Sequence, residues 1–233
     1  MYNSNKRFRL AELKREHVDE ASVLLGKMFL KYNNIWKTLG PTEDEVINFM
    51  AAKTHEMLDQ QDELREKGLI DKETFLNFIY LDKDDRIVGA WNTFDLYYYL
   101  KSKSEVNLHH FNAIEKYGKE LEKTILEADK VPKFTIYSLF TVIAEEFMGN
   151  GMIYLFTYDV FNYLHSRGYE AFYGRASNIK SFAIIHKLGA LKTSEVAMTE
   201  LGDDLKLYFI RFEIKDHHKM REGLEKIVAK LEA

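Results

Sequence analysis

The chain has 233 residues, of which 46% are hydrophobic and 14% aromatic, so it has enough apolar side chains for a buried core and is not of the disordered class. A formal net charge of −4, from 33 basic and 37 acidic residues, gives no electrostatic basis for binding nucleic acid. The absence of cysteine excludes disulfide bonds, thiolate zinc sites and cysteine nucleophiles.

Two amphipathic helices are predicted in the first third of the chain. Residues 8–13 alternate as a short strand, and apolar residues then recur on one helical face over residues 18–32. Thr42 and Glu45 have the spacing of a capping box, which predicts the start of a second helix. The charged residues 60–72 predict a solvated helix end and a loop.

A hairpin and a long helix follow. Residues 74–81 and 86–96 are strand-like and are separated by the short polar turn 82–85, which predicts a β-hairpin. Residues 106–130 keep apolar side chains on one helical face. They predict a helix inserted between the hairpin and the next strand.

The central stretch is a strand, a glycine-containing turn and a helix. Residues 134–143 are an apolar, β-branched and aromatic run typical of a buried strand, and a helix begins at Met152 and ends at Arg167–Gly168. Such a turn leaves backbone N–H groups unpaired at the helix N-terminus, where they and the helix dipole favour an anion such as a pyrophosphate. A Gly-x-Gly turn also serves as an ordinary connector without a ligand, so both interpretations stay open.

The last third of the chain adds a strand, a short helix, a hairpin and a C-terminal helix. These elements are predicted over residues 168–174, 178–190, 191–201 with 205–214, and 220–231. Because hairpins are mixed with strand–helix–strand crossovers, one mixed sheet covered by helices is expected. With only two prolines and no repeat there is no interdomain linker, so residues 1–233 are expected to form a single domain.

The turn at residues 144–151, together with the Asn178-containing helix that ends in Lys-Leu-Gly-Ala at residues 187–190, resembles the GNAT superfamily of acyl-CoA-dependent N-acyltransferases. The order of predicted elements matches that superfamily over nearly the whole chain. The resemblance implies an α/β fold, with a central mixed sheet of about six to seven strands and helices on both faces. The inserted helix, and residues 29–36 followed by Leu39–Gly40, are similar to the arylalkylamine (dopamine-type) N-acetyltransferases.

The resemblance also implies acetyl-CoA as cosubstrate and a place for each part of it. The pantetheine is expected on backbone at the end of the central strand, and the pyrophosphate on the turn that follows. The expected contacts are Thr141, Val142 and Ile143 on the strand, Met148, Gly149, Asn150, Gly151, Met152 and Ile153 at the turn, and Asn178 on the later helix. The family pattern Arg/Gln-x-x-Gly-x-Gly/Ala is kept at Gly151, but Met148 and Ile153 replace its first and last positions. Backbone amides form most of such a cradle, so coenzyme A binding is expected to persist.

Acyl transfer from a thioester to an amine requires a polarised carbonyl, a neutral amine held nearby and a donor for the leaving thiolate. Many GNAT enzymes place a tyrosine for the thiolate in the later helix, where this chain has Ile185. The arylalkylamine enzymes have two serines there, and Ser177 and Ser181 fit that spacing, with both hydroxyls expected on one helical face. Asn33–Asn34 replaces their glutamate at the end of the first helix, and Glu146 after the central strand is a further catalytic candidate. The structural alternatives are a helix cap, a solvent-facing hydroxyl and a solvated turn carboxylate.

Other titratable and aromatic side chains have structural explanations beside functional ones. Glu145, His109–His110 and His186 are solvated or capping groups if they lie outside the site, and His217–His218 lack ligand partners, so no metal site is expected. Five aromatic residues can line an acceptor pocket for an aromatic amine or pack in the core: Trp91, Phe94, Tyr97, Tyr98 and Tyr99.

The leading hypothesis is an N-acyltransferase that moves an acetyl group from acetyl-CoA to a small primary amine, such as an arylalkylamine, by direct transfer in a ternary complex. The alternatives are a GNAT-fold subunit that has lost catalysis and serves in binding or structure, and an acetyltransferase for protein N-termini or lysines. The start of the chain lacks the apolar core of a signal peptide, and no apolar run is long enough to span a bilayer. A cytoplasmic protein without nucleic-acid or membrane partners is expected, and its oligomeric state is left open.

Overall fold

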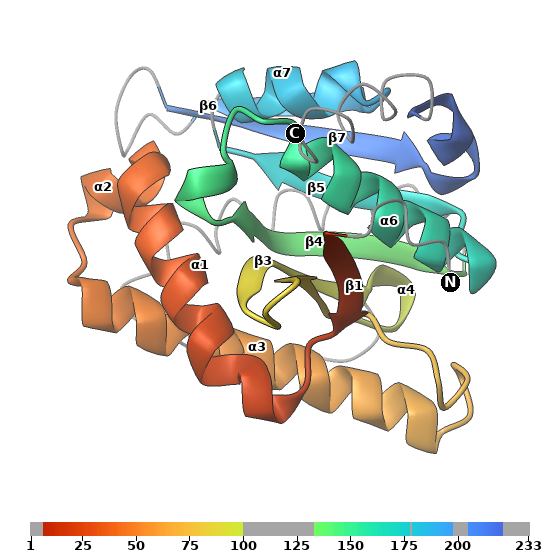
Figure 1. Cartoon of the computed structure of the whole chain (residues 1–233). Coiled ribbons are helices and arrows are strands. Elements are labelled where there is room, and N and C mark those ends of the chain that lie inside the picture. The colour runs from red at the N-terminus through yellow and green to blue at the C-terminus, as the bar shows by residue number, and fades with distance from the viewer. Residues whose placement is uncertain (1–6, 100–132, 178, 198–204, 221–233) are drawn as a thin grey trace.

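The computed structural model describes residues 7–99, 133–177, 179–197 and 205–220 (Figure 1). The helix predicted over residues 106–130, with His109 and His110 at its start, lies outside the described residues. So do Asn178 and, beyond its first residue, the C-terminal helix predicted over residues 220–231. Among the described residues, no helix combines the length and the apolar character needed to cross a bilayer.

Within the described ranges, seven strands form one sheet in the order β1-β2-β3-β4-β5-β7-β6. The strands are β1 (Phe8–Glu12), β2 (Phe78–Asp82), β3 (Ile87–Asp95), β4 (Thr135–Ile143), β5 (Ala171–Ala176), β6 (Leu191–Ala197) and β7 (Lys206–Glu213). Neighbouring strands are antiparallel except β4 and β5, which run parallel. The mixed sheet of six to seven strands predicted from the sequence is therefore confirmed.

Helices cover both faces of this sheet, as predicted (Figure 1). The helices are α1 (Val18–Tyr32), α2 (Asn34–Leu39), α3 (Glu43–Glu66), α4 (Leu96–Tyr99), α6 (Met152–Ser166) and α7 (Ile179–Lys187), with short 3-10 turns η1 (Arg15–His17), η3 (Glu145–Phe147) and η4 (Ile214–Met220). Side chains of α1 and α3 pack into one apolar cluster, and those of α6 and α7 pack into a second. Because β3 and β4 lie between the two layers, their side chains are buried on both faces, which is why β4 has a nearly continuous apolar sequence.

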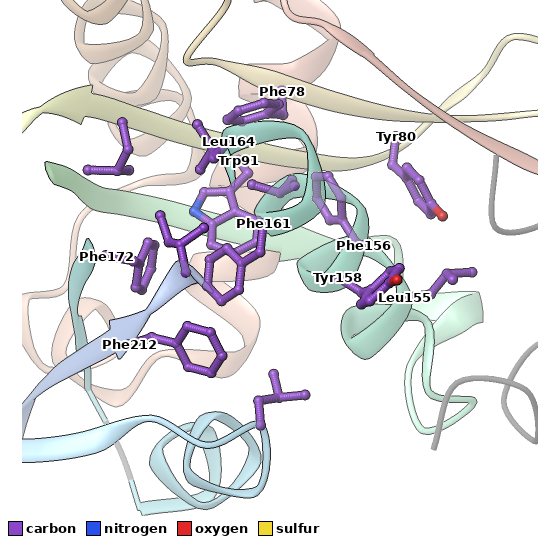
Figure 2. Packing of buried hydrophobic residues seen from close by; sticks show 14 of the residues in the cluster. Phe78, Tyr80, Trp91, Leu155, Phe156, Tyr158, Phe161, Leu164, Phe172 and Phe212 are labelled. Carbon is purple, nitrogen blue, oxygen red and sulfur yellow. The ribbon is translucent and has the colours of Figure 1, made fainter. Parts of the chain in front are cut away.

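The cluster on the α6 face is built mainly from aromatic rings. Figure 2 shows Trp91 of β3 among Phe156 and Phe161 of α6 and Phe172 of β5. The Trp91 ring lies 5.6, 5.9 and 5.7 Å from these three rings in turn. Edge-to-face and tilted pairs at such distances stabilise the fold beyond the burial of apolar area. This cluster fixes α6, and therefore the turn at its N-terminus, against the sheet.

The opposite layer depends on a close contact between α1 and α3 at Gly26. A Cβ added to Gly26 would lie 2.6 Å from Cγ1 of Ile47 and 3.2 Å from the Cα and N atoms of Ile47. The Ile47 side chain can rotate, but its backbone cannot move without separating the helices. We expect Gly26→Val to lower the free energy of unfolding by about 2–3 kcal/mol in urea denaturation. The control Lys27→Val, on the exposed face of the same helix, should change it by less than about 0.5 kcal/mol; equal losses would contradict this account.

The helix starts follow their local sequence signals. The Thr42 hydroxyl accepts a hydrogen bond from the Glu45 N–H at 3.3 Å, and the Glu45 carboxylate accepts one from the Thr42 N–H at 2.8 Å. The predicted capping box is therefore confirmed. Asn33 ends α1, as expected, but it also caps the unpredicted helix α2, where its side chain accepts from the Ile35 N–H at 3.0 Å.

The helix end predicted within residues 60–72 is confirmed, because α3 ends at Glu66. The expectation that this segment is solvated is wrong at Gln61, which is only 1% exposed. The Gln61 side chain accepts from the Leu76 N–H at 2.6 Å and donates to Glu12 at 3.0 Å. A polar residue is stable in the interior when its groups are paired in this way, and these partners are distant in the sequence. The hairpin also differs from its prediction, because β2 begins at Phe78 and β3 gives way to α4 after Asp95.

Candidate functional site

A gap opens in the sheet between β4 and β5. The last pair of residues between them is Tyr137 with Tyr173, although β4 continues to Ile143. On the other side of β4, the Ala144 N–H donates to the Val88 carbonyl at 2.8 Å. Because backbone groups alternate along a strand, the N–H and C=O of alternate residues of β4 then face the gap. Among the described residues no strand pairs with them there.

The three strand residues predicted to hold pantetheine do not all direct their backbone groups into the gap. Val142 lies two residues before Ala144, whose N–H donates to β3, so the backbone groups of Val142 also face β3 and point away from the gap. Thr141 and Ile143 direct their N–H and C=O groups into it. The amide groups of a pantetheine chain require such a row of donors and acceptors, so two of the three predicted residues are suited to that role.

A β-bulge lies in β4 where the gap begins. Thr93 pairs with Ser138 and Asn92 with Phe140, so Leu139 is an extra residue in β4. The bulge places the Ser138 and Thr141 side chains on the same face of the sheet, although they are three residues apart. Their face is the one covered by α6.

The turn between β4 and α6 presents backbone donors. Gly149 and Gly151 have left-handed φ angles of 77° and 86°, which glycine adopts without strain. Within the described residues, the N–H groups of Gly149, Gly151, Met152 and Ile153 have no hydrogen-bond acceptor. The first turn of α6 contains no acidic side chain that would compete for them. Unpaired donors at the positive end of a helix dipole form a site for an anion.

The side chains of this turn contribute less than its backbone. Met152 is fully buried in the α6 cluster and Ile153 packs against that cluster, so both anchor the helix. Met148 is 41% exposed, in the position where the family pattern has arginine or glutamine. Asn150 is half-buried, and its own N–H donates to the Phe147 carbonyl at 3.4 Å. The hydrogen-bond donors that this turn presents are therefore chiefly peptide N–H groups.

Two glutamates follow β4, and both are exposed and ion-paired. Glu145 accepts from the Lys31 ammonium at 2.6 Å and from the Tyr32 hydroxyl at 2.8 Å. The hydrogen bond from Lys31 is the main cause that lowers the pKa of Glu145. Glu146, the catalytic candidate, lies 3.1 Å from Arg86 on the turn between β2 and β3. The contact of Lys31 and Tyr32 with Glu145 joins the end of α1 to the start of the turn, and no local sequence signal indicates it.

Helix α7 carries one of the two predicted serines. It begins at Ile179, so Ser177 lies in the bend before it, and the expectation that both hydroxyls occupy one helical face is wrong. Ser181 is half-buried, one helical turn before Ile185. Ile185 packs against the α6 cluster, so Ser181 lies on the face of α7 that is turned toward the sheet.

The remaining candidates do not gather at the gap. Trp91 and Phe94 are 3% and 4% exposed and belong to different apolar clusters on opposite faces of the sheet, so they pack in the core and do not line one pocket. The His186 imidazole lies 3.0 Å from the Ala190 carbonyl and stacks on Phe182. In the described part of the chain, no group of three or more His, Cys, Asp or Glu side chains is arranged to hold a metal ion.

No protein-family model and no curated protein sequence matches the chain. Solved structures match its fold. The C-terminal condensation domain of Ebony, solved in complex with beta-alanyl-dopamine, has a TM-score of 0.69 at 14% identity, covering 89% of this chain and 99% of that one. Arylalkylamine N-acetyltransferase 2 from Aedes aegypti has a TM-score of 0.62 at 13% identity, with 89% and 99% covered. The polyamine N-acetyltransferase of Drosophila melanogaster has a TM-score of 0.59 at 11% identity, with 88% and 99% covered.

These neighbours are GNAT-fold proteins, and the chain has the GNAT fold. The similarity extends over most of each structure. At 11–14% identity the comparison concerns the fold alone. The activity has to be argued from the residues at the gap.

Proposed function

We propose that this chain is an N-acetyltransferase that transfers an acetyl group from acetyl-CoA to a primary amine while both substrates are bound. One observation carries the proposal: backbone groups of β4 that have no partner among the described residues lead along the gap to N–H groups at the start of α6 that likewise have none there. This arrangement fits a ligand that has an amide-containing arm and a pyrophosphate at its end. Coenzyme A has both parts in that order.

The residues at the gap have separate tasks in this transfer. The amine nitrogen attacks the acyl carbon, a C–N bond forms, the C–S bond breaks, and the electron pair leaves with the sulfur. Backbone N–H groups of β4 beside the bulge can polarise the acyl carbonyl. Ser181 on α7 is proposed to donate a hydrogen bond to the departing sulfur, since Ile185 cannot. Ser177 is proposed to support Ser181 through water, and the nitrogen releases its extra proton to solvent.

We assign the acceptor to the class of arylalkylamines. The solved neighbours that support this choice include an arylalkylamine N-acetyltransferase and a domain that binds beta-alanyl-dopamine. A polyamine N-acetyltransferase is also among them, so aliphatic polyamines belong in the same substrate panel. Acetylation of protein N-termini or lysines is the alternative for an enzyme with no activity on small amines.

The rival function is a GNAT-fold subunit without catalysis. Three observations favour it: Ile185 occupies the position of the usual tyrosine, Met148 occupies that of the usual arginine or glutamine, and Glu146 is an exposed partner of Arg86. A protein without catalysis would still bind coenzyme A if it kept the backbone donors of the turn before α6. Binding and turnover therefore have to be measured separately.

Acetyl-CoA is expected to stabilise the protein. A ligand present at a hundred times its dissociation constant adds about 2.7 kcal/mol to the free energy of unfolding, so a clear rise in melting temperature should follow. The measurement is thermal unfolding with acetyl-CoA, with coenzyme A, and with adenosine as a control that lacks the pyrophosphate. No shift at millimolar acetyl-CoA would contradict the proposed function, and binding without turnover on any amine or peptide would favour the rival.

A further inference from the structure

Three side chains form a hydrogen-bonded chain that leads to the gap. The Trp91 indole N–H donates to the Ser138 hydroxyl at 2.7 Å, and the Ser138 and Thr141 hydroxyl oxygens lie 3.3 Å apart. Trp91 is 3% exposed and Ser138 is 9% exposed, whereas Thr141 is half-buried. The chain therefore begins in the apolar cluster of α6 and ends at the gap.

The chemistry of these groups allows the chain to run from Trp91 to Thr141. An indole N–H can only donate, so it occupies an acceptor site of Ser138 and leaves the Ser138 hydroxyl proton available. The contact between the Ser138 and Thr141 oxygens fits either hydroxyl as the donor. With Ser138 donating to Thr141, the Thr141 hydroxyl proton is the end of the chain. Linked donors polarise one another, so this last O–H is a better donor than an isolated hydroxyl.

Thr141 lies near the start of the gap, where the proposed function places the thioester. Ser138 directly follows the last pair between β4 and β5, Tyr137 with Tyr173. Thr141 is opposite Trp91 in the sheet, and its backbone groups face the gap. The bulge at Leu139 is what aligns the Ser138 and Thr141 hydroxyls on the face covered by α6 and α7. Across the gap, Ile185 of α7 offers no polar group.

We propose that the Thr141 hydroxyl donates a hydrogen bond to the coenzyme A sulfur as the C–S bond breaks, and that Ser138 and Trp91 are positioning residues for that proton. The inference rests on the proposed function. Thr141 keeps its proton throughout, and the sulfur takes up a proton from solvent after the acetyl group has moved to the nitrogen. Thr141 acts from β4 and Ser181 from α7, so the two hydroxyls approach the sulfur from opposite sides of the gap.

The test is the pKa of the thiol of bound coenzyme A, followed by the ultraviolet absorbance of its thiolate across pH. A hydrogen bond to the thiolate lowers this pKa below that of free coenzyme A. Because hydrogen bonds to charged groups are the stronger kind, Thr141→Val should raise it by about one pKa unit. Thr141→Ser should restore it, and Ser138→Ala should raise it by a smaller amount. The control Thr38→Val removes a hydroxyl that donates to the Asn34 carbonyl on α2, and it should leave the pKa unchanged.

The outcomes separate this inference from the proposed function. If the wild-type protein does not bind coenzyme A, both fail. If it binds coenzyme A and Thr141→Val leaves the thiol pKa unchanged, the role of Thr141 is overturned, whereas the coenzyme A site of the proposed function stands. Melting temperature and the dissociation constant of coenzyme A are measured for each variant. If Thr141→Val does not fold, Ser138→Ala and Thr141→Ala decide the result, and an unchanged pKa in both would overturn it.

Discussion

Replacement of Gly151 by glutamate is expected to abolish coenzyme A binding and to leave the circular dichroism spectrum nearly unchanged. Gly151 has a φ of 86°, a left-handed conformation that costs a residue with a side chain about 1–2 kcal/mol. Its N–H is among the unpaired donors at the start of α6. A carboxylate at this position repels the pyrophosphate and competes with it for the helix N-terminus. Isothermal titration with coenzyme A measures the loss directly.

Helix α6 supplies a matched control at its opposite end. Gly168 has a φ of 84°, and a Cβ added there would meet no atom within 4 Å. Gly168→Glu therefore introduces the same charge and a similar backbone strain away from the turn. It should lower the melting temperature about as much as Gly151→Glu and keep coenzyme A affinity. Gly151→Ala separates strain from charge, since it adds only the Cβ. Full binding by Gly151→Glu would overturn the assignment of the turn.

The parts of the fold with local signals were predictable from the sequence. The capping box at Thr42 and Glu45, the apolar run of β4 and the glycine that starts α6 each depend on residues close together in the chain. Hairpins and crossovers in a fixed order then restrict the ways in which strands can be arranged in one sheet. The GNAT fold was predicted from the resemblance of the turn, the later helix and this order of elements to that superfamily.

The details of the candidate site depend on contacts between distant segments. The bulge at Leu139 comes from the pairing of β4 with β3, and it alone brings the Ser138 and Thr141 hydroxyls together. From the sequence, Thr141 is predicted only as a residue whose backbone binds pantetheine. No local sequence signal connects its side chain to Trp91. The extension of β5 to Ala176, beyond the predicted strand end at residue 174, likewise keeps Ser177 out of α7, because β5 pairs with β7 through Ala176. Pairing register is a property of the whole sheet, and local propensity does not determine it.

Ser181→Ala is expected to lower kcat roughly ten- to a hundred-fold, with little change in coenzyme A affinity. General acid–base assistance is worth about 10²- to 10⁴-fold, and a hydroxyl that only donates a hydrogen bond belongs at or below the low end. Steady-state kinetics with a panel of arylalkylamines and polyamines measures the effect. An unchanged kcat would remove Ser181 from the mechanism. The matched control is Ser166→Ala, which removes a hydroxyl that donates to the Tyr163 carbonyl at the far end of α6.

A double-mutant cycle with Thr141→Val shows whether the two hydroxyls act on one sulfur. If both hydrogen-bond the departing thiolate, each single change leaves one donor in place, and the double variant loses more than the product of the two single losses. Independent tasks, such as Ser181 on the sulfur and Thr141 on a pantetheine amide, give losses that multiply. The second result would keep Ser181 as the donor to the sulfur and would assign Thr141 to substrate binding. Thr141→Val would then raise KM for acetyl-CoA and leave kcat unchanged.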